Sequence, residues 1–291
     1  MLISRREFVA GAALTTTVMA GRARGQSATA AAPLRIGMTD WNLGKRADIT
    51  KIALAREIGL DGIQVSITYP TDGSPTLRDL ETQAAFKQAA LDNGVQICSL
   101  AIGSPGPSRL PLHTNPAAAI LLVEAVEVAR NLGTTNILLP ILGNSHIDMT
   151  NQKEVDTFVA MMKEVARYAE KAGVVVALED WVSPEDNVRL VDAIGSDYVG
   201  VYYDAHNTKI KGHDPYVGPK LLGKHINQIH VKNAAMLLRE PGEIDWPRLA
   251  QEYHDIGYHG WVVLETESPS KDVIADTRTN IEYVRKTFRM A

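Results

Sequence analysis

Four apolar runs recur in the second half of the chain: VVVALE (174–179), VGVYYD (199–204), INQIHV (226–231) and WVVLE (261–265). Each run reaches an ionisable side chain at or near its C-terminal end, and these side chains are Glu179, Asp204, His230 and Glu265. The runs follow one another at about 25 to 35 residues, which is the repeat of a strand followed by a helix. Because the strands of a closed parallel β/α barrel point their C-terminal ends to one face, we expect these four side chains to converge.

The same alternation runs through the chain from Leu34 onward. Strand patterns occupy Arg35–Thr39, Gly62–Val65, Gln96–Ala101, Asn136–Pro140, Val174–Glu179, Val199–Asp204, Gln228–Val231 and Trp261–Glu265. Helical patterns alternate with them at Asp48–Ile58, Leu77–Asn93, Pro116–Leu132, Lys153–Ala172, Pro184–Ile194, Asp214–Leu222, Trp246–Ile256 and Lys271–Phe288. Eight such units predict an α/β protein with a single-domain (β/α)8 barrel over residues 34–291.

Glycine positions support this count of units. A glycine follows most of the predicted helices, where a left-handed C-cap favours it: Gly59, Gly94, Gly133, Gly173, Gly195, Gly223 and Gly257. A doubly wound open sheet is the competing architecture, but it usually has fewer strands and a glycine-rich phosphate loop after the first one. The segment Thr39-Asp40-Trp41-Asn42 is not such a loop, so the barrel is favoured.

The composition restricts the class of protein. Hydrophobic residues make up 45% and charged residues 22% of the 291 positions, which is typical of a globular domain of barrel size. The formal net charge of −4 provides no basic surface for a phosphate backbone, so no nucleic-acid partner is expected. The single cysteine, Cys98, cannot form an intramolecular disulfide, and its apolar run QICSLAI predicts a buried thiol.

The first 33 residues differ from the rest. Ser4-Arg5-Arg6-Glu7 resembles the twin-arginine export motif, and Val9–Gly21 is weakly hydrophobic but too short for a permanent membrane span. We therefore predict a twin-arginine signal peptide and flexible tether over residues 1–33, with export to the periplasm. A disordered basic N-terminus and a retained, uncleaved anchor are the alternatives.

The four converging side chains form an oxygen-rich set of candidate metal ligands. Hard carboxylates favour hard ions, and the set contains no thiolate that would select a softer one. The set therefore predicts one divalent cation, Mn²⁺ in the first place, with Mg²⁺, Co²⁺ and Zn²⁺ also compatible. A carboxylate at a strand end is often only a helix cap or an ion-pair partner, but four ligands in consecutive strands favour a shared metal site.

The last four strands resemble the xylose isomerase-like TIM-barrel superfamily, in its sugar phosphate isomerase/epimerase branch with the ketose 3-epimerases. The resemblance rests on Leu178-Glu179, Tyr203-Asp204-Ala205-His206-Asn207, His230-Val231-Lys232 and Leu264-Glu265-Thr266. It implies a TIM barrel that binds one divalent ion through Glu179, Asp204, His230 and Glu265. It also implies that the two glutamates are the catalytic proton-transfer pair and that Glu185 and Asn207 contact the sugar. Many members have Asp where this chain has Asn233, and many ketose 3-epimerases have His where Asn207 stands.

The predicted chemistry is proton abstraction next to a carbonyl. Such a proton is weakly acidic in water, so its removal requires stabilisation of an enediolate, which a chelating divalent ion provides. If one glutamate removes the proton and the other returns it from the opposite face, the carbon is epimerised. Return to the neighbouring carbon gives aldose–ketose isomerisation, and loss of a β-hydroxyl gives dehydration of a keto-sugar or inosose. The sequence leaves these three outcomes open.

Two further functions belong to other classes. A non-catalytic carbohydrate-binding barrel would not need two glutamates that can accept protons. An endonuclease-like phosphodiesterase would need a multi-metal cluster and a basic groove. The expected partner is a sugar, keto-sugar or cyclitol, and no Arg/Lys cluster marks a phosphate pocket. Homo-oligomerisation remains open.

Five other side chains are candidates for the substrate side of the site: Trp41, Trp181, His146, His206 and Lys232. The two tryptophans either form an apolar wall against a sugar ring or pack in the core. His146 lies in the loop after the fourth strand, where a solvated histidine is the alternative. His206 is expected to support the metal ligands. Lys232 points inward like His230 and either reaches the substrate or pairs with a carboxylate.

Overall fold

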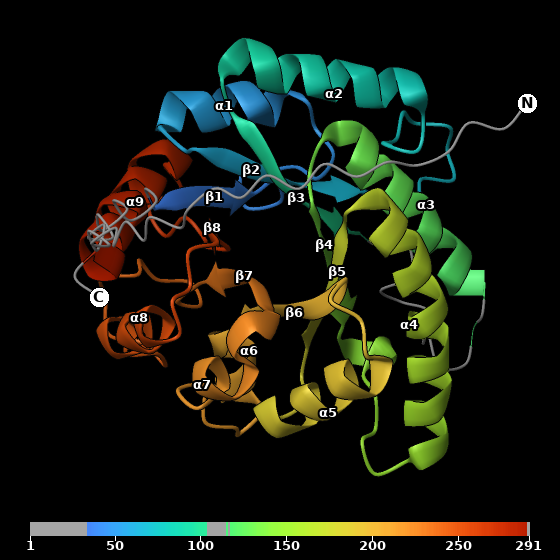
Figure 1. Cartoon of the computed structure of the whole chain (residues 1–291). Coiled ribbons are helices and arrows are strands. Elements are labelled where there is room, and N and C mark those ends of the chain that lie inside the picture. Colours follow the sequence, from blue (N-terminus) through green and yellow to red (C-terminus); the bar gives the residue numbers. More distant parts are fainter. Residues whose placement is uncertain (1–33, 104–114, 116, 290–291) are drawn as a thin grey trace, which may run out of the picture. The chain divides into compact units, whose positions relative to one another are not determined.

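The barrel is closed. The computed structural model describes residues 34–103, 115 and 117–289, so the predicted signal peptide and tether lie outside the described residues. Eight parallel strands follow one another in chain order, and β8 pairs with β1 to complete the ring (Figure 1). The helices pack around its outside. The predicted α/β fold, a (β/α)8 TIM barrel, is confirmed.

All eight strands begin and end within two residues of their predicted bounds. They are β1 (Arg35–Thr39), β2 (Gly62–Ile67), β3 (Gln96–Ile102), β4 (Asn136–Ile141), β5 (Val175–Asp180), β6 (Val199–Asp204), β7 (Ile226–Val231) and β8 (Trp261–Leu264). Glu179 is the next-to-last residue of β5, Asp204 is the last of β6, and Glu265 directly follows β8. The polar strand ends therefore share the C-terminal face of the barrel.

The described helices cover the strands in the expected alternation. They are α1 (Thr50–Ile58), α2 (Leu80–Asn93), α3 (Ala117–Leu132), α4 (Gln152–Ala172), α5 (Pro184–Ile194), α6 (Ala205–Ile210), α7 (Gly218–Leu222), α8 (Trp246–Asp255) and α9 (Val273–Arg289). Two 3-10 turns, Gly143–Ser145 and Gly223–His225, precede α4 and β7. The seven glycines predicted to follow helices all have positive φ angles, as expected for chain reversals.

The connection between β6 and β7 departs from the prediction of one helix over Asp214–Leu222. Two short helices, α6 and α7, occupy it. The Oδ1 atom of Asp204 accepts the backbone N–H of Asn207 over 2.9 Å and thereby caps a helix that starts directly at the strand end. Gly212, with φ of 87°, then turns the chain before α7. The metal-ligand candidate Asp204 therefore also fixes the start of a helix.

Two apolar cores hold the barrel. The larger one lies between the strands and the surrounding helices. The smaller one fills the barrel interior and consists of Cys98, Ala101, Leu138, Ala177, Tyr202, Trp261 and Val263. The Cys98 thiol is buried as predicted, and burial raises its pKa to about 12. Because this interior is filled, chemistry is confined to the C-terminal mouth of the barrel.

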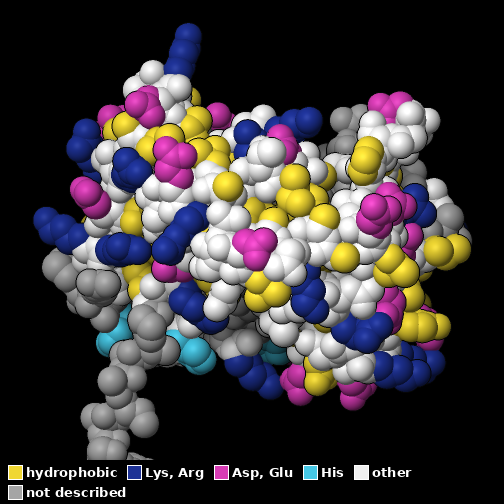
Figure 2. Space-filling view, turned by 90° about the horizontal axis from the view of Figure 1, so that it is seen from above, with side chains coloured by type: hydrophobic (Ala, Val, Ile, Leu, Met, Phe, Trp, Pro, Cys, Tyr) yellow, Lys and Arg dark blue, Asp and Glu magenta, His cyan; other side chains and the backbone are white. Residues whose placement is uncertain are grey.

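The surface in Figure 2 carries interspersed basic and acidic side chains, without one continuous basic region. Large exposed apolar side chains on α2 and α3 include Leu80, Leu91 and Ile120. Among the described residues, no helix combines the length and the apolar character that a membrane crossing requires.

The packing of Trp261 against Gly62 gives a test of the interior core. A Cβ atom at Gly62 would lie 2.7 Å from the Trp261 ring and 2.9 Å from the carbonyl oxygen of Gln96. We expect Gly62→Ala to lower the free energy of unfolding by about 1–3 kcal/mol, because the added methyl group overpacks the core. Thermal denaturation measures the change. Ala85→Ser on the exposed side of α2 is the control, and an equal effect of both substitutions would contradict the packing.

Candidate metal centre

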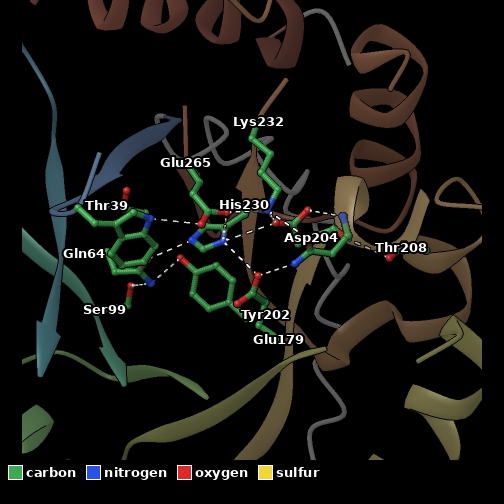
Figure 3. Close-up of polar contacts among 12 residues, drawn as sticks. Thr39, Gln64, Ser99, Glu179, Tyr202, Asp204, Thr208, His230, Lys232 and Glu265 are labelled. Carbon is green, nitrogen blue, oxygen red and sulfur yellow. Dashed lines mark hydrogen bonds and ion pairs between the residues drawn. The ribbon is translucent and has the colours of Figure 1, made fainter. Parts of the chain in front are cut away.

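The four predicted ligands converge at the mouth of the barrel. One ligand atom from each of Glu179, Asp204, His230 and Glu265 can be chosen so that all four atoms lie within 4.8 Å of one another. Figure 3 shows the side chains pointing toward one point from β5, β6, β7 and the end of β8. The first three are buried, and the side chain of Glu265 is 21% exposed. Strand ends thus bring together residues that are up to 86 positions apart in the chain.

His230 is held in one orientation by a buried amide. Its Nε2 atom lies 3.1 Å from Oε1 of Gln64, while the amide nitrogen of Gln64 lies 2.8 Å from Oγ of Ser99 and 3.1 Å from the hydroxyl of Tyr202. With its NH2 group committed to these hydroxyls, Gln64 presents its oxygen to the imidazole. The proton of neutral His230 therefore resides on Nε2, and Nδ1 carries the lone pair.

The Nδ1 atom of His230 faces three carboxylates. It lies 3.9 Å from Oε1 of Glu179, 3.8 Å from Oδ2 of Asp204 and 3.4 Å from Oε2 of Glu265. This buried nitrogen makes no hydrogen bond to any residue that the structure describes. A lone pair surrounded by carboxylate oxygens is unfavourable unless a proton or a cation lies between them. One nitrogen and three carboxylates fit a divalent cation.

Lys232 and Asn207 complete the polar layer. The Nζ atom of Lys232 lies 2.7 Å from Oδ2 of Asp204 and 2.8 Å from Oε2 of Glu265. It also donates to Oδ1 of Asn207 over 3.1 Å, and Nδ2 of Asn207 donates to Oε1 of Glu179 over 2.7 Å. Of the two interpretations of Lys232, the structure shows the ion pair, although the side chain also lines the cavity. The neighbouring acids raise the pKa of Lys232 despite its burial.

The two glutamates differ in proton affinity. Burial raises the pKa of Glu179, and the charge of Glu265 raises it further. Burial acts in the same direction on Glu265, but the positive charges of His230 and Lys232 outweigh it, so the pKa of Glu265 is lowered. Two carboxylates whose environments push their pKa values apart are suited to act as acid and base.

A cavity of about 580 Å³ opens over these residues. Both predicted tryptophans line it, and Nε1 of Trp41 also donates to Oε1 of Glu265 over 3.3 Å. Arg46, which sequence analysis did not identify, lines the cavity with its guanidinium 4.1 Å from the centre of the Trp41 ring. An apolar wall beside a few oriented polar groups is typical of a small-molecule site.

Three candidates lie outside the lining of this cavity. Glu185 is exposed in the first turn of α5. His206 is partly buried in α6, directly after Asp204. His146 lies beside Trp181, with ring centres 6.1 Å apart, but it lines a second cavity next to this one. The predicted sugar contacts of these three residues remain predictions.

The residues that support His230 could have been recognised in the sequence as polar side chains within apolar strands. Gln64 and Ser99 are polar side chains in the otherwise apolar strands GIQVSI and QICSLAI, and both are fully buried. A buried amide needs hydrogen-bond partners, so its presence in a core strand indicates a specific polar contact. The hydrogen-bond partner of this amide lies on another strand, so it cannot be predicted from the neighbouring sequence.

The family model described as "Xylose isomerase-like TIM barrel" matches residues 52–287, most of the chain. This chain belongs to the xylose isomerase-like TIM barrel family. A relative, the 2-epi-5-epi-valiolone 7-phosphate 2-epimerase of an Actinoplanes species, is 28% identical over 204 residues, which cover 68% of this chain and 72% of the relative.

Two solved epimerase structures share the fold. The D-psicose 3-epimerase of Clostridium cellulolyticum H10, solved with D-tagatose, superposes with a TM-score of 0.72 at 16% identity and covers 88% of this chain and 99% of that one. An L-ribulose 3-epimerase gives a TM-score of 0.73 at 16% identity, covering 89% of this chain and 95% of that one.

The departure from the family motif at Asn233 has a structural explanation. Its side-chain nitrogen donates to the carbonyl oxygens of Leu237 and Glu240 over 2.9 and 3.0 Å. An ionised aspartate has no donor and could not make these bonds. Asn233 therefore holds the loop after β7, and it takes no part in the ligand set.

The contact between Gln64 and His230 generates a prediction about metal affinity. We expect Gln64→Leu to weaken Mn²⁺ binding by about 10- to 100-fold, because the imidazole loses the acceptor that fixes its tautomer. Calorimetric titration measures the affinity. Gln228→Leu is the matched control, since Gln228 is an equally buried barrel glutamine that donates to the carbonyl oxygen of Cys98. Equal weakening in both variants would show that the effect is only a general loss of stability.

Proposed function

We propose that this protein is a metal-dependent sugar epimerase or isomerase that works by proton abstraction next to a carbonyl. The observation that carries the proposal is the Nδ1 lone pair of His230 facing three carboxylates, two of which are glutamates with oppositely shifted pKa values. Epimerase activity in the names of related proteins supports the same reaction class. A divalent ion bound by Glu179, Asp204, His230 and Glu265, most readily Mn²⁺, would stabilise the negative charge of an enediolate.

The protein residues then have separable roles. Glu265, whose pKa is lowered, is ionised and able to accept the proton from the substrate carbon. Glu179 would be the partner carboxylate that returns a proton from the other side. Lys232 and Asn207 orient these two carboxylates through their hydrogen bonds. Trp41 and Trp181 form the apolar part of the wall and limit access of water.

One experiment tests the proposal directly. Metal analysis of the purified protein should find about one divalent ion per chain. The loaded protein should then exchange hydrogen on the carbon next to the carbonyl with solvent deuterium, in a panel of ketoses and inososes. The proposal is contradicted if the protein binds no divalent ion and exchanges hydrogen in none of these sugars.

The glutamate pair gives a mutational prediction. Glu179→Gln and Glu265→Gln should each lower the rate of deuterium exchange by at least about 10²- to 10⁴-fold, because each removes a proton carrier. Circular dichroism should show an intact barrel. Glu282→Gln, at an exposed site on α9, should exchange at the normal rate. Normal exchange in either active-site variant, with the ion retained, would exclude that glutamate from proton transfer.

Metal binding should depend on pH in a defined direction. Burial alone would lower the pKa of His230, but the charges of Glu265 and Glu179 outweigh it, so the pKa is raised. The pKa of Glu179 is also raised. Protons on both groups compete with the ion, so Mn²⁺ affinity should increase as the pH rises from about 5 to about 8. Titrations at several pH values measure this trend, and a constant or falling affinity would contradict it.

Export is a separate proposal. The twin-arginine motif at Arg5 and Arg6 would deliver the folded, metal-loaded protein to the periplasm. Replacing both residues by lysine should hold the full-length protein in the cytoplasm, because recognition depends on the guanidinium groups as well as on charge. Cell fractionation measures the distribution. Periplasmic delivery of the double variant at the parental level would show that the motif is not used.

A further inference from the structure

A second cavity lies next to the main one on the same face of the barrel. Its volume is about 420 Å³, and Trp181 lines both cavities. The rest of its lining comes from segments that follow β4, β5 and α6, and includes His146, Asp148, Asp186 and His213. The proton-transfer mechanism uses none of these residues and therefore does not explain this cavity.

Trp181 is held in place between the two cavities. The Nζ atom of Lys211 lies 3.5 Å from the centre of its ring, and the His146 ring is tilted against it at 6.1 Å. A cation over an indole fixes the ring by electrostatic attraction. A fixed aromatic side chain that lines two neighbouring cavities is suited to contact one ligand that extends from the first cavity into the second.

The polar groups of the second cavity suit hydroxyl groups. His146 is exposed and His213 is half-buried, so both imidazoles are accessible to a ligand in this cavity. Burial and the charge of Lys211 lower the pKa of His146, so its imidazole is neutral near pH 7 and offers one donor and one acceptor. The Oδ1 atom of Asp148 accepts from Thr150, and its second oxygen makes no hydrogen bond within the described part of the chain.

The charges around the second cavity do not favour an anionic ligand group. Asp148 and Asp186 contribute two carboxylates, and no lysine or arginine is among the lining residues of this cavity. Asp186 is already paired with Arg189 over 2.6 Å, and Asp148 is exposed. Lys211 lies against Trp181 at the edge of the cavity. These acidic and basic groups offset one another, so no excess of positive charge favours a phosphate or carboxylate. An uncharged, hydroxyl-rich group would instead find an aromatic wall, the imidazoles of His146 and His213, and carboxylate acceptors.

We infer that the second cavity binds an uncharged sugar ring that is linked through a glycosidic bond to the ring held at the metal centre. The substrate is thus a glycoside, and Trp181 contacts both of its rings. The inference rests on the proposed function for the occupant of the main cavity. It names the substrate class of that site, and it adds His146 and His213 as residues that distinguish a glycoside from a free monosaccharide.

Equilibrium binding tests the inference without requiring turnover. The Mn²⁺-loaded protein is titrated calorimetrically with D-fructose and with three glucosyl-fructoses of different linkage, turanose, maltulose and isomaltulose. At least one disaccharide should bind about tenfold or more tightly than fructose. His213→Ala should remove most of this advantage, because a lost hydrogen bond is worth up to about tenfold in affinity. Fructose affinity should change by less than about twofold, since His213 does not line the main cavity.

The matched control is His259→Ala, which removes an exposed imidazole before β8, at the opposite end of the barrel. It should leave the affinity for the disaccharide unchanged. The inference is overturned if no disaccharide binds more tightly than fructose, or if His213→Ala keeps the full advantage. Deuterium exchange is measured separately on the same samples. A disaccharide advantage that depends on His213, without any exchange, would uphold the second ring site and refute the catalytic proposal alone.

Discussion

The candidate site depends on one buried hydrogen bond, from Nε2 of His230 to the amide oxygen of Gln64. This bond assigns the imidazole proton and leaves the Nδ1 lone pair directed at Glu179, Asp204 and Glu265. Four electron-rich atoms at such separations are unstable together without positive charge. Lys232 supplies part of that charge from the edge of the group. The centre remains suited to a cation. Burial raises the pKa of Glu179, whereas the positive charges of His230 and Lys232 lower that of Glu265.

The barrel makes this arrangement possible because the residues that stabilise its interior differ from the residues that form the candidate metal site. Trp261 and Tyr202 fill the interior, and Tyr202 packs 4.5 Å from the His230 ring while its hydroxyl contacts Gln64. The ligands therefore rest on a packed layer that belongs to the core. Loops above this layer form the two cavities on either side of Trp181. Substrate preference can then be set by loop residues such as His213 without disturbing the ligands.

The strands and the ionisable residues at their ends could be predicted from the sequence, because both depend on local pattern. Strand ends at Glu179, Asp204, His230 and Glu265 could be located because apolar runs of strand length stop there, and barrel geometry then required convergence. The contacts of Gln64 could not be predicted, because its partners lie on β3, β6 and β7 and meet only when the barrel closes. The helix α6 was missed because six residues carry little periodic signal. His146 was placed on the correct face, but the partition of that face into two cavities depends on the position of Trp181.

The central claim is that His230 and three carboxylates hold one divalent ion, with Nδ1 of His230 as the nitrogen ligand. A crystal structure of the Mn²⁺-loaded protein, with anomalous diffraction recorded at the manganese absorption edge, tests it most directly. The account predicts one strong anomalous peak per chain, within bonding distance of Nδ1 of His230 and of oxygens from Glu179, Asp204 and Glu265. A manganese peak elsewhere, coordination through Nε2 with loss of the Gln64 contact, or the absence of any peak at this face would contradict it.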